Sequence, residues 1–143
     1  MNTSLITPFM SITLGATIIS IVTIASGGVF LLRVVTGNHE ANGLQKSFFR
    51  AGHAHAGVLV MLGLLLSVLG NAAGANPAWA NGGAIAVLLA AILMPAGFFL
   101  SVLGPNPARP NRMIASVWVG ATLLIAGVLT SGVTTLLAGI DRL

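Results

Sequence analysis

The chain has 143 residues, of which only 6% are charged and 56% are hydrophobic, and its formal net charge is +4. Globular proteins carry about 25% charged residues, so these proportions exclude an ordinary soluble domain. The chain has no cysteine, which excludes disulfides, thiolate metal sites and thiol nucleophiles. We therefore expect a membrane protein whose positive charge reflects membrane topology rather than binding to nucleic acid.

Four apolar segments are each about 20 residues or longer, enough for a helix to cross a hydrocarbon layer of roughly 30 Å. Inside a bilayer each segment must be helical, because a helix satisfies its own backbone hydrogen bonds. The predicted fold is all-α: a polytopic, four-transmembrane-helix bundle that occupies residues 1–143 as a single domain. The predicted spans are residues 8–32, 48–69, 83–103 and 113–137.

The sequence between the spans predicts where helices begin and end. Thr7 before Pro8 is typical of a helix cap followed by proline in the first turn. A polar connection over 34–47 follows the first span, and an uncharged loop over 71–81 follows the second. After the third span, three prolines interrupt the chain, and Asn111 is suited to cap the fourth helix.

Basic residues predict the orientation of the bundle. Five of the six lie beside the first and third connections, and the sixth, Arg142, lies near the C-terminus beside Asp141. Connections rich in Lys and Arg stay in the cytoplasm, so we expect both termini outside the cell membrane. The five residues are Arg33, Lys46, Arg50, Arg109 and Arg112.

Small residues form a repeated pattern that predicts close helix packing. They follow one another at steps of 4, 7 and 4 in the second span, and the same steps recur 64 positions later in the fourth. Such stripes let membrane helices approach closely, and they are consistent with two fused helical hairpins of the same orientation. They also favour a homo-oligomer or a subunit of a larger membrane complex. The eight positions are Gly52, Ala56, Gly63, Ser67, Ser116, Gly120, Gly127 and Ser131.

His53 and His55 are the ionisable side chains that lie well inside a predicted span. At about 100° per residue they point roughly 160° apart, which disfavours one ion held by both from one side. A histidine inside a span is costly and indicates function. Three hypotheses remain open: a structural hydrogen bond, ligation of haem or a transition metal with a further ligand from another helix or subunit, and proton or substrate movement.

Two resemblances accompany this segment. The His-x-His pair on one membrane helix resembles the catalytic subunit of haem-copper oxidases, whose two histidines face different haems. The size, four spans, outside termini and Arg50 at the start of the second span resemble the membrane glutathione-transferase and eicosanoid enzyme family. Ala54 and Gly57 stand where that family's Arg-x-x-x-Asn-x-x-Glu signature has Asn and Glu.

The sequence thus predicts a small membrane binding or accessory protein, with haem or a metal on His53 or His55. One alternative is a small oligomeric channel or transporter that these histidines line or gate. Another is a membrane enzyme of the glutathione-transferase kind. No serine triad or carboxylate pair is evident and no Asp or Glu lies in a predicted span, so a hydrolytic enzyme is not expected.

Overall fold

The computed structural model describes residues 7–143, and within them it contains four long α-helices and no strands. All four helical regions are long and apolar enough to cross a membrane, which confirms the predicted all-α membrane bundle. The helices are α1 (Pro8–Val35), α2 (Gly43–Ala72), α3 (Pro77–Ser101) and α4 (Ala115–Ile140), with a short 3₁₀ helix, η1 (Arg112–Ile114), before the last.

Two predicted helix caps are confirmed. The Thr7 hydroxyl accepts a hydrogen bond from the backbone N–H of Met10 at 3.2 Å, at the start of α1. The Asn111 side chain accepts one from the N–H of Met113 at 2.8 Å, at the start of η1. In both places a polar side chain satisfies an N–H group that has no partner within the helix.

α2 begins at Gly43, earlier than the predicted span at residue 48. The cause is a capping box, in which the Asn42 side chain accepts from the N–H of Gln45 at 2.9 Å and the Gln45 side chain accepts from the N–H of Asn42 at 3.0 Å. α3 likewise begins at Pro77, behind an Asn76 cap. Hydropathy locates the part of a helix that lies in hydrocarbon, and it misses the polar first turns.

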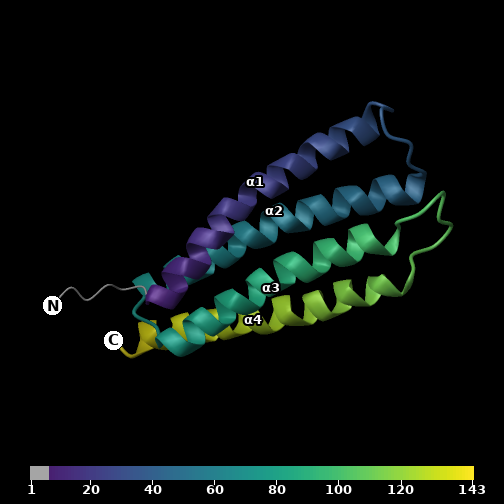
Figure 1. The fold of residues 1–143 in the computed structure, drawn as a ribbon. Coiled ribbons are helices and arrows are strands. Elements are labelled where there is room, and N and C mark those ends of the chain that lie inside the picture. Colours follow the sequence, from purple (N-terminus) through teal and green to yellow (C-terminus); the bar gives the residue numbers. More distant parts are fainter. Residues whose placement is uncertain (1–6) are drawn as a thin grey trace.

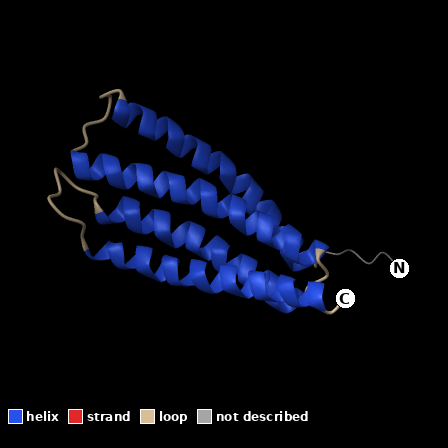
Figure 2. Cartoon of the chain, turned by 180° about the vertical axis from the view of Figure 1, so that it is seen from behind, coloured by secondary structure: helices blue, strands red, loops and turns tan. Residues whose placement is uncertain are grey.

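The helices lie antiparallel in chain order, with α3 between α2 and α4 and with α1 outermost beside α2 (Figures 1 and 2). α3 makes the most extensive packing, against both neighbours, whereas α1 packs sparsely on α2. The start of α1 and the end of α4 share one end of the bundle with the second connection (Figure 1). The first and third connections lie together at the opposite end (Figure 1).

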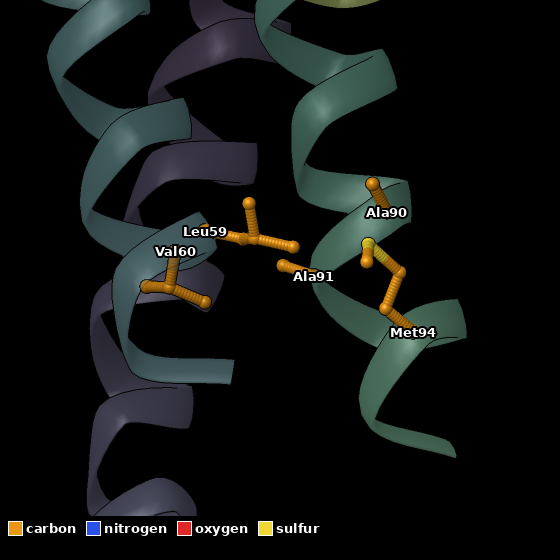
Figure 3. Close-up of a cluster of buried hydrophobic side chains, with 5 residues drawn as sticks. All are labelled: Leu59, Val60, Ala90, Ala91 and Met94. Carbon is orange, nitrogen blue, oxygen red and sulfur yellow. The ribbon is translucent and has the colours of Figure 1, made fainter. Parts of the chain in front are cut away.

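α2 and α3 meet through a cluster of buried apolar side chains (Figure 3). Leu59 and Val60 of α2 face Ala90, Ala91 and Met94 of α3, and all five are at least nine-tenths buried. The two alanines leave room for the larger side chains opposite, so the helices approach closely.

The small-residue stripes of α2 and α4 lie mainly against α3. A Cβ atom on Gly52 would lie 2.8 Å from the Phe99 ring, and one on Gly120 would lie 3.0 Å from the backbone N of Met94. A Cβ on Gly127 would lie 2.7 Å from the backbone oxygen of Gly83. A larger residue would have to displace the Phe99 ring at Gly52 and the backbone of α3 at Gly120 and Gly127.

The remaining stripe positions differ in what they contact. The Ser116 hydroxyl donates to the backbone oxygen of Leu93 in α3 at 2.8 Å. Ser67 and Ser131 are buried, and their hydroxyls have no hydrogen-bond partner within the described residues. Ala56 departs from the others, because it lines a groove beside α1.

Candidate functional site

His53 and His55 are both half-buried, and they contact different helices. The His53 ring lies in a notch formed by two glycines of α1. A Cβ atom on Gly27 would lie 3.2 Å from His53 Nδ1, and one on Gly28 would lie 3.6 Å from Nε2. On the other side of α2, His55 Nδ1 lies 2.7 Å from the backbone oxygen of Ala51, and its ring lies 5.1 Å from the ring of Phe98 in α3.

The two imidazoles therefore have different surroundings. The ring of His55 is held by the oxygen of Ala51 in its own helix. None of the side-chain hydrogen bonds found among residues 7–143 involves the ring of His53. The His53 ring thus packs as a polar, half-buried group against the glycines of α1. Arg50, one turn before it, is exposed and donates from Nε to the backbone oxygen of Lys46 at 3.2 Å.

A cavity of about 730 Å³, here called the end cavity, opens at the end of the bundle that carries the first and third connections. Phe30, Phe49 and Phe99, from three different helices, form its aromatic wall. The ring centroid of Phe49 lies 5.3 Å from that of Phe30 and 5.4 Å from that of Phe99. His39 and Glu40 also line the cavity, and the His39 ring packs edge-on against Phe30 at 5.3 Å.

A second cavity of about 580 Å³, here called the midspan groove, lies nearer the start of α1 than the end cavity does. It is bounded by α1, α2 and α3. Most of its lining is aliphatic, including Ile24 of α1 and Val60 of α2. Four hydroxyl side chains of α1 recur along this groove at helical spacing. They are Thr13, Thr17, Ser20 and Thr23.

Three of the four hydroxyls that line the midspan groove donate to backbone oxygens of α1. Thr13 donates to the backbone oxygen of Phe9 at 3.0 Å, and Thr17 donates to that of Thr13 at 2.8 Å. Ser20 donates to the oxygen of Thr17 at 2.7 Å. Each of these three hydroxyl hydrogens is therefore bonded within α1, and the hydroxyl oxygens can still accept a hydrogen bond from a bound solute.

Along both α1 and α2, the contact between His53 and the glycine notch falls between residues that line the end cavity and residues that line the midspan groove. Along α1, Phe30 lines the end cavity, the Gly27–Gly28 notch follows, and Ile24 lines the groove. Along α2 the corresponding order is Phe49, His53 and Ala56. The His53 imidazole thus lies against two glycines of α1, at a position along the α1–α2 interface between the residues that line the two cavities, although it lines neither cavity itself.

The arrangement limits how a cofactor could be held. Among residues 7–143 no group of three or more His, Cys, Asp or Glu side chains is placed to hold a metal ion. Because His53 faces α1 and His55 faces α3, the chain does not bring both imidazoles to one ion. Haem or metal binding stays a prediction, with each histidine taking its further ligand from another helix or subunit.

Comparison of the sequence with models of protein families found no match, and neither did comparison with curated proteins or with solved structures.

Three features of this site were not identified from the sequence: the glycine notch, the aromatic wall and the hydroxyl row on α1. A signal for the notch exists, since Gly27 and Gly28 form a pair within an apolar helix. The hydroxyl row is also visible as Ser and Thr at spacings of three and four. The aromatic wall joins residues from three helices, so only the tertiary structure assembles it.

Proposed function

We propose that this protein is a small membrane channel or transporter in which His53 closes a path along the α1–α2 interface. The position of His53 between the end cavity and the midspan groove supports this function. It is the first of the two alternatives that the sequence suggests, and the contact of His53 with the glycine notch between the two cavity linings supports it.

The chemistry of the path suits a solute that donates hydrogen bonds. In the proposed opening step, the His53 ring leaves the notch, where the two glycines have no side chain to take its place, and the two cavities become joined. The groove beyond it offers hydroxyl lone pairs at regular intervals. A donor-bearing solute could exchange its water for these acceptors, which lowers the cost of entering the apolar span.

The closing role of His53 is testable by chemical modification, since the chain has no cysteine of its own. A Ser20→Cys variant places one thiol in the midspan groove. With a water-soluble, charged thiol reagent on both sides of the membrane, we expect modification to be about tenfold faster when the chain also carries His53→Ala, which corresponds to a barrier lower by about 1.4 kcal/mol.

The matched control for this experiment is Ser26→Cys. Ser26 is an exposed residue of α1 whose hydroxyl, like that of Ser20, bonds a backbone oxygen of its own helix. Ser26 does not line the midspan groove. Its modification rate should be the same with and without the His53→Ala substitution in α2. Equal rates for Ser20→Cys in the two backgrounds would remove the proposal.

We also propose that the protein lies in the cell membrane with the first and third connections in the cytoplasm. The support is the concentration of basic residues there, together with the common end that these two connections share. Ala78 and Ala108 are both exposed and lie near opposite ends of the bundle. In intact cells, an impermeant thiol reagent should label Ala78→Cys and should not label Ala108→Cys, and the reverse pattern would invert the orientation.

A further inference from the structure

A groove of about 670 Å³ lies at the end of the bundle opposite the end cavity, between the second connection, the start of α3 and the end of α4. Leu129, Val133 and Leu137 recur every four residues along its α4 side, and each is more than half exposed. They span about 12 Å of helix at 1.5 Å per residue. Trp79 of α3 is 65% exposed and also lines the groove. This apolar strip has the form and chemistry to accept an acyl chain.

The polar end of the groove carries one negative and one positive side chain. Asp141 and Arg142 are adjacent, exposed, and both line the groove. The guanidinium of Arg142 lies directly over Gly74 in the second connection, where any Cβ atom would collide with it. Gly74 has a φ of +62°, a left-handed conformation that glycine adopts readily. The glycine thus provides both the turn and the space that Arg142 occupies.

We propose that this groove binds a phospholipid whose headgroup carries a phosphate and a primary ammonium, as in a phosphoethanolamine lipid. The Arg142 guanidinium is a fork of donors suited to phosphate. The neighbouring Asp141 carboxylate is suited to accept from the ammonium. A headgroup with a phosphate but no cation would meet repulsion from Asp141, and a choline headgroup has no N–H to donate. The acyl chain lies along the α4 strip beside Trp79.

Trp79 supplies a reporter inside the groove. The chain has two tryptophans, so Trp118→Phe leaves Trp79 as the single fluorophore. The full chain is placed in three sets of phosphatidylcholine vesicles, each with the same small fraction of a lipid whose brominated chains quench nearby indoles. The three sets differ in the headgroup of the brominated lipid, which is phosphoethanolamine, phosphocholine or phosphoglycerol. We expect quenching by the ethanolamine lipid to exceed quenching by each of the other two by about twofold, because exposed ion pairs contribute only a small binding preference.

Two variants test whether this headgroup preference depends on the charged side chains at the polar end of the groove. Asp141→Asn should reduce quenching by the ethanolamine lipid to the level of the choline lipid, and Arg142→Gln should reduce quenching by the ethanolamine lipid as well. The control protein carries Trp79→Phe and retains Trp118, which does not line the groove and should show no headgroup preference. Equal quenching of Trp79 by all three lipids, or stronger quenching by the anionic glycerol lipid, would overturn the proposal.

Discussion

Gly127→Leu is expected to separate α4 from α3 and to destabilise the bundle by about 3 kcal/mol or more, as severe overpacking does. A Cβ atom at this position would lie 2.7 Å from the backbone oxygen of Gly83 and 2.8 Å from a methyl of Val87. The backbone of α3 cannot move aside as a flexible side chain can. Thermal unfolding of the purified protein in detergent should show the loss directly.

Two further substitutions test whether the loss of stability comes from the position of the leucine in the bundle and not from the introduction of leucine as such. Gly132→Leu introduces the same side chain on α4 where no atom lies within 4 Å, and it should leave the unfolding temperature nearly unchanged. Gly63→Leu should have an intermediate effect, because the nearest obstacle there is the movable end of the Leu88 side chain. Equal stability of the Gly127 and Gly132 variants would refute close α3–α4 packing at this site.

Gln45→Ala is the second substitution for which we expect a large effect. The buried Gln45 amide nitrogen donates to the backbone oxygens of Val102 and Gly104, each at 3.1 Å, and so connects α2 to the end of α3. Alanine would leave both oxygens without this donor and would remove half of the capping box. We expect a loss of about 1–3 kcal/mol in the free energy of unfolding.

Ser47→Ala is the control for this prediction. Ser47 also lies in the first turns of α2, but it is exposed and its hydroxyl bonds only the backbone oxygen of Gly43 in the same helix. Denaturant or thermal unfolding should distinguish the two variants clearly. A Gln45→Ala protein as stable as the Ser47→Ala protein would mean that the hydrogen bonds to α3 contribute nothing to stability.

Hydropathy was sufficient to predict the number of helices and their approximate positions, because a bilayer requires long apolar helices. It could not predict which apolar residues lie in the protein interior. Val87 and Ile92 are both aliphatic residues of α3, yet Val87 is completely buried and Ile92 is 65% exposed. Lipid and protein interior are equally apolar, so the contrast that marks the buried face of a soluble helix is weak here.

The candidate site was predictable only in part. The sequence indicates that His53 and His55 point in different directions, because the helical repeat fixes their angle. It does not indicate that α1 offers His53 a glycine notch, since the pairing of helices depends on packing between segments distant in the chain. The end cavity depends on the same kind of information, because Phe30, Phe49 and Phe99 lie on three separate helices.

The hydrogen bonds of Gln45 also bear on the order in which the protein matures during synthesis. Gln45 emerges from the ribosome well before its partners, which lie 57 and 59 residues later in the chain. When the first hairpin enters the membrane, this amide must therefore rely on interfacial water. Its burial has to wait for α3 to be inserted, so the start of α2 reaches its final state only after the third connection has been translated.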